Sequence, residues 1–397
     1  MLSEKSRPVI EATAEVVAAH MDEITPKFYA HMFEAHPELL NGVFSRANQR
    51  NGEQPKALSG SIVRFAVHLL EHPDSYPEAV LSRIAHKHTS LGITEDQYQI
   101  VYENLFWAIA DTLGEAVTEE VAEAWTEVYW LMADALIKLE KGLYAQQANT
   151  KMWTPWRVES KEPAGASAFT FRLVPADDTP ATVGEPGQYV SVRLPVADGL
   201  LQARQYSLSS DAASADVRVI TVKRDDGGEV SPVLHDSVQV GDVLEVSNPY
   251  GDLTLSTVSA DEERPLVLAT AGIGITPAAA ILQDLAARGS QRRVIALHAD
   301  RSAAALTLAD EVRAAVDALP HGELHLWLDS TEDAPEGLGA RAGRLDIAQA
   351  QVPQDADVVL CGPLPFMQAA RSALIEAGVP ATQIHYEIFG PDLWLAA

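Results

Sequence analysis

The spacing of apolar residues changes abruptly near residue 150, and no single layer architecture accommodates the patterns on its two sides. Before this point apolar residues recur at helical spacing, without strand-like alternation. The helical segments cover residues 11–21, 25–35, 54–70, 95–113 and 119–144. Gly92 and Thr94 stand where one helix stops and the next begins, with Thr94 as N-cap. The sequence therefore predicts an all-α domain over residues 1–148.

From Trp153 onward the chain is rich in short strand-like runs separated by glycine, proline and aspartate. These runs cover residues 169–174, 188–194, 204–208, 217–223 and 243–246. β-branched residues and period-two alternation at this spacing are typical of a small antiparallel barrel. We expect this β-barrel domain over residues 152–260.

A third pattern begins near Glu263, where short apolar runs alternate with helical segments. The strand-like runs cover residues 265–269, 294–298, 324–328 and 358–361. Alternating strands and helices predict a parallel, doubly wound sheet, which we expect over residues 263–397. The predicted multidomain order is therefore all-α, antiparallel β-barrel and α/β.

The charge and cysteine content exclude several classes of partner and site. The formal net charge of −27 opposes binding to nucleic acid or anionic membranes, because long-range repulsion acts against both encounters. The single cysteine, Cys361, excludes an internal disulfide and fits a reducing compartment. The N-terminus lacks the apolar core of a signal peptide, and the uncharged run 265–282 contains glycines that predict a turn. We expect a cytoplasmic protein without stable membrane insertion.

One short helix carries two histidines, His86 and His88. Because they are two positions apart, they point to nearly opposite sides of the helix and cannot both face one pocket. One imidazole can ligate a haem iron, and the other is then solvated. A histidine considered alone is more often a surface or core residue than a metal ligand, so its position in the domain must decide.

A predicted strand carries the motif Arg-Gln-Tyr-Ser at 204–207, which resembles the flavin signature of the ferredoxin reductase family. Arginine can pair with a pyrophosphate, tyrosine can stack on an isoalloxazine and serine can bond the flavin edge. The glycine-containing runs 187–189 and 227–231 flank the motif, and the second opens a predicted helix whose N–H groups would receive FAD phosphates. The alternative is a barrel strand followed by a glycine turn. The flavin-binding residues expected are Tyr189, Arg204, Gln205, Tyr206, Ser207, Gly228, Val230 and Ser231.

The run 265–269 leads into the loop Thr-Ala-Gly-Ile-Gly-Ile-Thr-Pro at 270–277, which opens a helix. The loop lacks the third glycine of the Rossmann motif and resembles instead the nicotinamide nucleotide loop of the ferredoxin reductase family. Small residues there let backbone N–H groups approach a pyrophosphate. Another strand ends in Cys361, which lies near the nicotinamide in that family, although taken alone it also fits a buried, inert thiol. The nucleotide-binding residues expected are Gly272, Ile273, Gly274, Ile275, Thr276, Pro277 and Cys361.

Five segments of the helical domain together resemble the globin domain of bacterial and yeast flavohaemoglobins. Their sequences are Phe-Tyr-Ala-His-Met-Phe at 28–33, His-Pro-Glu-Leu at 36–39, Asn-Gln-Arg-Asn-Gly-Glu-Gln at 48–54, Lys-His-Thr-Ser at 87–90 and Asp-Gln-Tyr-Gln-Ile-Val at 96–101. The Asn-Gln-Arg-Asn-Gly block is highly specific, and the resemblance extends over the whole chain. It implies a globin fused to a reductase, with haem b, FAD and NAD(P)H as cofactors.

The resemblance assigns roles around the haem. It makes His88 the proximal iron ligand and His86 a bystander. On the distal side Tyr29 would donate to bound O₂ and stabilise its developing negative charge in a dry cavity. The distal neighbours that it implies are Gln54, Leu58, one helical turn further on, and Phe44, which would pack against the porphyrin.

On the proximal side the resemblance points to Tyr98 and Glu140 as catalytic partners of the imidazole, with Lys87 tuning the redox properties. A carboxylate and a phenol beside an imidazole raise its electron donation to iron. Considered on their own, Glu140 is typical of a solvated helix face, and Tyr98 fits a helix core near Tyr102. Only the resemblance places these two residues at a haem.

The segment Tyr-Glu-Ile-Phe-Gly-Pro at 386–391 resembles the terminal segment of the family, whose aromatic residue covers the flavin ring. It implies redox tuning by Glu387 and cofactor binding by Ile388, Phe389, Gly390 and Pro391. The chain departs from the family where Pro-Val at 232–233 replaces Asn-Trp, where Ile275 replaces a glutamine and where Ile388 replaces a cysteine. These departures concern individual cofactor contacts.

The activity that the resemblance implies is nitric oxide dioxygenation, with electrons passing from NAD(P)H through FAD to the haem while NO and O₂ become nitrate. The alternatives are a haem-flavin reductase acting on peroxides or other acceptors, and a gas sensor. No kinase, cyclase or DNA-binding segment follows, which argues against the sensor. The loop at 298–302 offers no phosphate-binding pair beyond Arg301, which favours NADH. We expect a monomer whose partners are NO, O₂ and NAD(P)H.

Overall fold

The computed structural model describes residues 1–42, 44, 46, 53–258 and 261–392, without the side chains of 53–55, 57 and 59. Contacts divide the chain into two compact units. The first contains Met1–Met152, Pro195–Ala203 and the residues from Gly390 onward, and the second contains Trp153–Leu194 and Arg204–Phe389.

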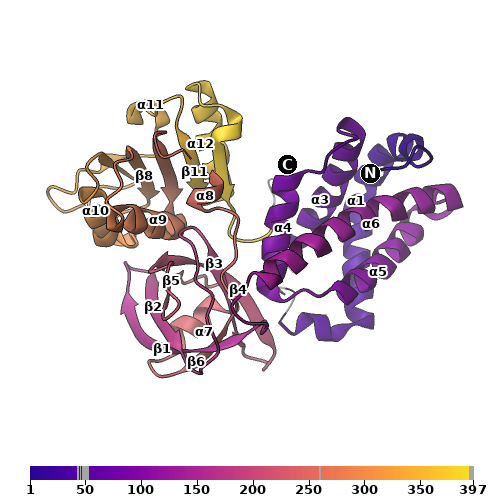
Figure 1. The fold of residues 1–397 in the computed structure, drawn as a ribbon, viewed down its shortest axis with the longest axis horizontal. Helices are drawn as coiled ribbons and strands as arrows, with labels where there is room; N and C mark the ends of the chain where they lie inside the picture. The colour runs from indigo at the N-terminus through magenta and orange to yellow at the C-terminus, as the bar shows by residue number, and fades with distance from the viewer. Residues whose placement is uncertain (43, 45, 47–52, 259–260, 393–397) are drawn as a thin grey trace. The chain divides into compact units, whose positions relative to one another are not determined.

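The first unit is built mainly from α-helices (Figure 1). These are α1 (Arg7–Ala35), α3 (Glu53–Glu71), α4 (Glu78–Leu91), α5 (Glu95–Leu113) and α6 (Glu119–Ala145), with 3₁₀ helices η1 (Pro37–Leu40) and η2 (Gly114–Ala116). Helix α1 packs against α3 and α5, and α4 packs against α6. The apolar stripes predicted from the sequence face one another in these pairs.

The junction between α4 and α5 is fixed by local chemistry. Helix α4 ends at Gly92, whose φ of 78° is left-handed and whose N–H donates to the carbonyls of His88 and Thr89. Helix α5 then begins after Thr94, the N-cap that the sequence predicts, and Thr94 forms a capping box with Gln97. His88 consequently lies in the last turn of α4.

The segments predicted at 11–21 and 25–35 form one continuous helix, α1, with Pro26 inside it. A proline removes one backbone hydrogen bond, so it weakens a helix that packing does not support. Here Ile24 and Phe28 are buried on either side of Pro26, and Thr25 donates its hydroxyl to the Met21 carbonyl. Tertiary packing therefore carries the helix across the proline.

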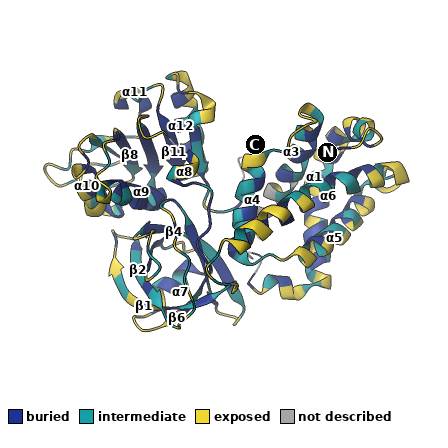
Figure 2. Cartoon of the chain, viewed as in Figure 1, coloured by how far each residue is buried: buried dark blue, intermediate teal, exposed yellow. Residues whose placement is uncertain are grey.

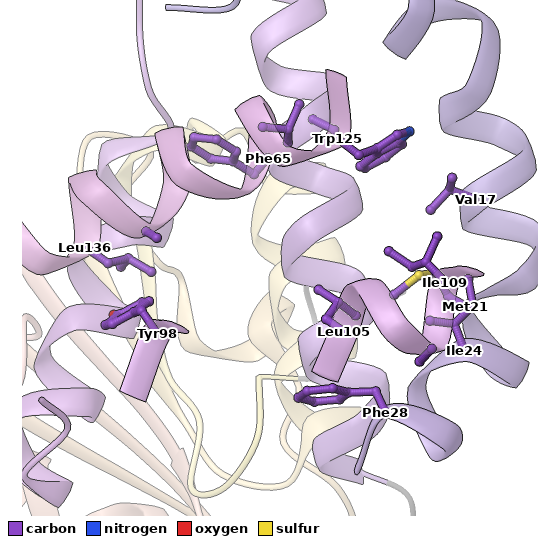
Figure 3. Close-up of a cluster of buried hydrophobic side chains, with 14 of the residues drawn as sticks. Val17, Met21, Ile24, Phe28, Phe65, Tyr98, Leu105, Ile109, Trp125 and Leu136 are labelled. Atoms are coloured by element: carbon purple, nitrogen blue, oxygen red, sulfur yellow. The ribbon is translucent and has the colours of Figure 1, made fainter. Parts of the chain in front are cut away.

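Large apolar side chains from α1, α3, α5 and α6 fill the helical core. Figure 3 shows Val17, Met21 and Ile24 gathered near Ile109, with Leu105 and Phe28 close by. Full burial of a side chain of this size stabilises the fold by about 1.5–3 kcal/mol. Trp125 is also buried, and its indole N–H donates to the Thr13 hydroxyl at 3.0 Å, so the polar end of the ring is satisfied.

The middle of the chain forms a closed antiparallel barrel. Its strands are β1 (Thr154–Pro163), β2 (Ala168–Pro175), β3 (Tyr189–Pro195), β4 (Leu201–Ser210), β5 (Arg218–Lys223) and β6 (Val243–Val246), in the order β1-β2-β5-β4-β3-β6. The short helix α7 (Ser231–Asp236) follows β5, where the sequence predicts a helix.

The last third of the chain forms a six-stranded sheet in the order β10-β9-β8-β7-β11-β12, and each of the pairings is parallel. Its strands are β7 (Leu266–Ala271), β8 (Val294–Asp300), β9 (Gly322–Leu328), β10 (Arg341–Ala342), β11 (Asp357–Cys361) and β12 (Ile384–Glu387). The central strands are buried (Figure 2). The strand order reverses between β7 and β11, so the carboxyl edge there is the expected place for a ligand.

Helices flank this sheet. They are α8 (Leu255–Val258), α9 (Ile275–Ala287), α10 (Ala309–Asp317), α11 (Ile347–Ala350) and α12 (Leu364–Glu376), with 3₁₀ helices η3 (Gly272–Gly274), η4 (Ala303–Ala305) and η5 (Ala381–Gln383). Helix α9 packs against α10, and α11 packs against α12.

The structure confirms the predicted order of all-α, antiparallel β-barrel and doubly wound α/β folds. Strands β1, β10 and β12 were not among the predicted runs. The half-buried, charge-rich end of β1 hides its alternation, and β10 has only two residues. Within the described residues, no helix is long and apolar enough to span a membrane.

Candidate functional site

Three residues predicted for the proximal side of a haem come together from three helices. His88 of α4 contacts Tyr98 of α5 and Glu140 of α6. Its Nδ1 lies 2.8 Å from Glu140 Oε1 and 3.0 Å from the Tyr98 hydroxyl. The Tyr98 hydroxyl in turn donates to the same carboxylate oxygen at 2.5 Å. One buried carboxylate oxygen therefore binds both the imidazole and the phenol.

The hydrogen-bond directions in this cluster determine which imidazole nitrogen can bind a metal. Burial, and then the charge of Glu140, raise the pKa of Tyr98, so its phenol keeps its proton and donates it. The carboxylate then accepts from both neighbours, which places a proton on Nδ1 of His88. Nε2 carries the lone pair and has no hydrogen-bond partner among the described residues. This is the tautomer that binds iron through Nε2.

The side chains of His88, Glu140 and Tyr98 differ in their exposure to solvent. The His88 side chain is 32% exposed, so part of the ring is accessible to a ligand, whereas the Glu140 side chain is 4% exposed. Tyr98 is also buried, and its backbone carbonyl accepts from the Tyr129 hydroxyl at 2.6 Å. Sequence reasoning missed Tyr129, because an aromatic residue on α6 has no local signal that separates support of a site from ordinary core packing.

Lys87 lies next to the ligand in sequence and donates its ammonium group to the carbonyl of Gly390. Both residues belong to the first compact unit. Arg83, one helical turn earlier, pairs with Asp392 at 2.9 Å in the same unit. Lys87 is thus close in sequence to the imidazole, and its ammonium group contacts a backbone carbonyl that lies far along the chain.

The predicted distal tyrosine lies in an aromatic cluster. Tyr29 of α1 is buried, and its ring centroid is 5.6 Å from that of Phe33 and 6.0 Å from that of Phe44. Phe33 and Phe44 also contact each other at 5.3 Å. Leu58 of α3 is half-buried against the same hydrophobic core. The side chain of Gln54 lies outside the described residues.

The flavin motif lies on β4, with Ser207 buried and Arg204, Gln205 and Tyr206 half-buried. Gln205 donates its amide to the Ser191 hydroxyl at 3.4 Å. Burial raises the pKa of Tyr206, with Asp225 adding to the shift and Arg204 opposing it, so the phenol stays neutral.

Tyr189 of β3 is buried beside a glycine that approaches its ring. A Cβ at Gly251, where φ is +123°, would lie 3.1 Å from the ring of Tyr189. Glycine is therefore favoured at position 251 for both conformation and space.

The turn between β5 and α7 is built around Asp225. The Ser231 hydroxyl donates to the Asp225 carbonyl at 3.3 Å and accepts from the Asp225 N–H at 3.0 Å, while the Gly228 N–H donates to the same carbonyl at 3.0 Å. Val230, at the N-cap of α7, is buried. These contacts organise the turn that the sequence assigns to FAD phosphates.

The glycine loop 272–274 and the ends of β11 and β12 meet at the carboxyl edge of the parallel sheet. A Cβ at Gly274 would lie 2.2 Å from the Cys361 carbonyl oxygen, so only glycine allows this close approach. Cys361 and Glu387 are register partners on adjacent strands. Burial, and then the charge of Glu387, raise the pKa of Cys361, so it is a protonated thiol and not a thiolate nucleophile.

The other residues predicted for nucleotide binding and for the C-terminal segment lie in or next to these elements. Ile275, Thr276 and Pro277 are buried in the first turn of α9, and Ile273 lies in η3. After β12, Ile388 is half-buried and Phe389 is 47% exposed, while Pro391 is buried. The sequence did not single out Lys223 at the end of β5, whose ammonium group lies 3.9 Å from the Cβ position of Gly272.

The comparisons with known proteins agree with the order of a helical domain, a β-barrel and a parallel sheet. Family models match a globin at residues 26–136, an oxidoreductase FAD-binding domain at 156–255 and an oxidoreductase NAD-binding domain at 268–372. The chain is 42% identical to the flavohemoprotein of Chromobacterium violaceum, with 98% of each chain covered.

Solved structures are similar as well. A flavohemoglobin from Malassezia yamatoensis with bound FAD and haem is 45% identical with a TM-score of 0.93, covering 98% of this chain and all of that one. The FAD/NAD-binding domain of the nitric oxide dioxygenase from Vibrio cholerae is 34% identical with a TM-score of 0.55 and covers 61% of this chain and 100% of its own.

Fold and site thus define an oxidoreductase that joins a globin to FAD- and NAD-binding domains. The chain belongs to the flavohaemoglobin (flavohemoprotein) family. Its cofactors are haem, FAD and a nicotinamide dinucleotide. The described residues fit the haem, because the imidazole of His88, held through Nδ1 by a buried carboxylate, presents Nε2 as the nitrogen donor that a haem iron requires.

Proposed function

We propose that this protein is a nitric oxide dioxygenase, which converts NO and O₂ to nitrate with electrons from NAD(P)H. The observation that carries this proposal is the contact of Glu140 and Tyr98 with the Nδ1 of His88. A carboxylate at this nitrogen increases the electron donation of the imidazole, which favours activation of O₂ over simple reversible binding. The relationship to the Vibrio cholerae nitric oxide dioxygenase supports the same reaction.

On the proximal side, each residue has a definite task. Glu140 holds the Nδ1 proton of His88 and so keeps its Nε2 unprotonated. Tyr98 donates to the same oxygen and fixes the carboxylate in place. Because Glu140 is buried, its charge is weakly screened and acts strongly on the ring.

On the distal side, Tyr29 is the proposed donor to the oxygen substrate. A phenol hydroxyl stabilises negative charge that develops on O₂ during the reaction. Phe33 and Phe44 surround the ring of Tyr29 with apolar surface, which excludes water and strengthens this hydrogen bond. Leu58 limits the space available to substrates, and Gln54 is proposed as a second polar group beside Tyr29.

When bound, the haem supplies O₂ binding and one-electron chemistry, and the flavin converts a hydride into single electrons. NO, O₂ and one electron give NO₃⁻, so the hydride of one NAD(P)H supports the oxidation of two NO molecules. The residues of the reductase domains bind and orient the two organic cofactors.

In the proposed arrangement, the main-chain N–H groups of the loop 272–274 bind the dinucleotide pyrophosphate, since its glycines leave the backbone accessible. Tyr189, Tyr206 and Ser207 bind the flavin. Cys361, as a buried neutral thiol, packs near the nicotinamide and transfers no proton.

The decisive experiment compares NO consumption by the full chain and by Tyr29→Phe, with NADH and O₂ present. Loss of one donor to a developing oxyanion is expected to slow NO consumption by about 10²–10³-fold. Flavin reduction by NADH should be unchanged. Tyr102→Phe is the matched control, because the Tyr102 hydroxyl instead faces Thr126 at 3.1 Å.

Two results would overturn the proposed reaction. One is NO consumption by Tyr29→Phe that equals that of the unaltered chain. The other is an organic hydroperoxide that outcompetes NO at equal concentration, which would favour a haem-flavin peroxide reductase.

A further inference from the structure

A turn of the β-barrel packs into the core of the α/β domain. The turn at 164–167 joins β1 to β2 and belongs, like the parallel sheet, to the second compact unit. Ala164 and Ala168, at its two ends, are buried in the same hydrophobic cluster as Ile275 of α9 and Val312 of α10. The barrel and the sheet domain therefore share core side chains at this point, and both ends of the turn are anchored.

Gly165 brings this turn against the backbone that follows η4. Its φ of +86° lies in the left-handed region, which favours glycine. A Cβ at this position would lie 2.6 Å from the Leu306 carbonyl oxygen, far inside van der Waals contact. The Leu306 backbone cannot easily move away, because its side chain is buried in a cluster with Leu326 and Leu328 of β9. Glycine at position 165 therefore allows an approach that a larger residue would prevent.

A backbone hydrogen bond crosses the same contact, and a carboxylate supports its acceptor. The Ala166 N–H donates to the Ala304 carbonyl at 3.0 Å. Asp333 accepts from the N–H groups of Ala303 and Ala304 at 3.2 and 3.0 Å, one at each carboxylate oxygen. The hydrogen bond from Ala304 is the main cause that lowers the pKa of Asp333, so the carboxylate is charged at neutral pH. Asp333 thus holds η4 where it can accept from the turn.

The contact between 164–167 and 303–306, called the joint below, is connected to both predicted cofactor sites. On the barrel side, the Ser167 carbonyl accepts from the Arg224 N–H at 2.9 Å, just after β5, and β5 pairs with β4, which carries the motif predicted for the flavin. On the sheet side, η4 follows β8, which pairs with β7 directly before the loop 272–274. A displacement at the joint therefore moves the flavin strand relative to the nucleotide loop.

We propose that Gly165 and Asp333 are positioning residues for hydride transfer, because they fix the joint that sets the nicotinamide against the flavin. The hydride carries two electrons and a proton from the dihydronicotinamide to the flavin, and such a step needs the reacting atoms about 3–3.5 Å apart. A small displacement of the joint therefore slows the transfer, although each cofactor still binds to its own domain. The inference rests on the cofactor sites proposed above and is independent of the reaction at the haem.

The test measures anaerobic reduction of the flavin by NADH in a single turnover of the full-length holoprotein, without NO. For Gly165→Ala we expect the limiting rate at saturating NADH to fall by about 10²-fold, while the Kd of NADH stays unchanged. Asp333→Asn should lower the same rate less, because asparagine keeps one of the two acceptor oxygens. The matched control is Gly289→Ala, where φ is +63° and a Cβ would meet nothing within 4 Å, so the rate should not change.

A second measurement does not depend on hydride transfer. Hydrogen exchange followed by mass spectrometry should show faster exchange of the amides at 303–306 in Gly165→Ala and Asp333→Asn than in Gly289→Ala, because the contacts that protect them are weakened. Unchanged limiting rates in the first two variants would overturn the proposal, and so would a raised Kd of NADH that accounts for the whole loss. If Gly165→Ala does not retain FAD, the rate of Asp333→Asn decides alone. Because no NO is present, these outcomes are separate from the test of NO dioxygenation.

Discussion

The globin and the NAD-binding domain each hold a buried polar cluster around one imidazole, and the two clusters differ in the partner of Nδ1. In the globin, Nδ1 of His88 contacts the buried carboxylate of Glu140. In the NAD-binding domain, Nδ1 of His298 contacts the neutral hydroxyl of Thr270.

The difference shows that the partner and not the residue type decides what an imidazole can do. A carboxylate makes the ring electron-rich and directs the lone pair of Nε2 outward, which suits a metal ligand. A hydroxyl adds no charge, so burial dominates at His298 and lowers its pKa to about 4. That ring is therefore uncharged at neutral pH. The following predictions test this contrast.

The largest effect is expected from His88→Ala. Without the imidazole the globin should bind haem poorly, and NO consumption should fall to the level of a haem-free preparation. The Soret absorbance of the purified protein and an NO electrode measure both properties. His86→Ala is the control and should keep its haem. Full haem content and activity in His88→Ala would remove His88 from the proposed site.

Glu140→Gln tests the carboxylate side of the contrast. The substitution keeps a hydrogen-bond acceptor but removes the charge, and NO consumption should fall by about 10–100-fold. The haem reduction potential should rise, because a less electron-rich imidazole stabilises ferric iron less. A spectroelectrochemical titration measures this shift, which a purely structural role of Glu140 would not produce. Glu103→Gln, on the exposed face of α5, should leave both properties unchanged.

The pKa of His298 predicts a dependence of stability on pH. In the unfolded chain this histidine titrates near 6.5, and in the folded chain near 4. Between these values the unfolded state binds a proton that the folded state does not, so the free energy of unfolding falls as the pH falls. Between pH 7 and pH 5 the loss from this group is about 2 kcal/mol.

Urea unfolding of the full chain, followed by flavin fluorescence, measures this loss at the two pH values. The variant His298→Gln does not titrate in this range and should lose less stability on acidification than the unaltered protein. Equal losses in the two proteins would show that His298 is not held neutral by its surroundings.

The smallest effect is expected from Thr270→Val. This substitution keeps the shape of the side chain and removes only the hydroxyl, which lies 2.8 Å from His298 Nδ1 and donates to the Leu297 carbonyl at 3.3 Å. Its loss should lower the free energy of unfolding by about 1 kcal/mol. Thr307→Val is the control, since its buried hydroxyl makes only a 3.4 Å contact with the Ala305 carbonyl in its own turn. An unchanged stability in Thr270→Val would mean that the hydroxyl does not orient the imidazole.

Much of the fold follows from local pattern alone. The predicted helix at 95–113 coincides with α5, and the predicted strand at 243–246 coincides with β6, because caps and period-two alternation act over a few residues. Strand β12 and the continuity of α1 across Pro26 were not predicted. Both depend on neighbours that are distant in sequence, namely β11 for the strand and the helical core for α1.

The three folds, their order and the motifs of the reductase follow from the sequence alone. Periodicity, glycine turns and strand–helix alternation each depend on residues that are close together in the chain. Which side chains contact each imidazole depends on the tertiary structure. Glu140 looks like a solvated helix residue until α4, α5 and α6 pack and bury it against His88. Likewise, the carboxylate of Asp300 is buried beside His298 only because β8 extends two residues beyond that histidine. Burial gives such a side chain a specific role, because it removes the water that would otherwise form its hydrogen bonds and screen its charge.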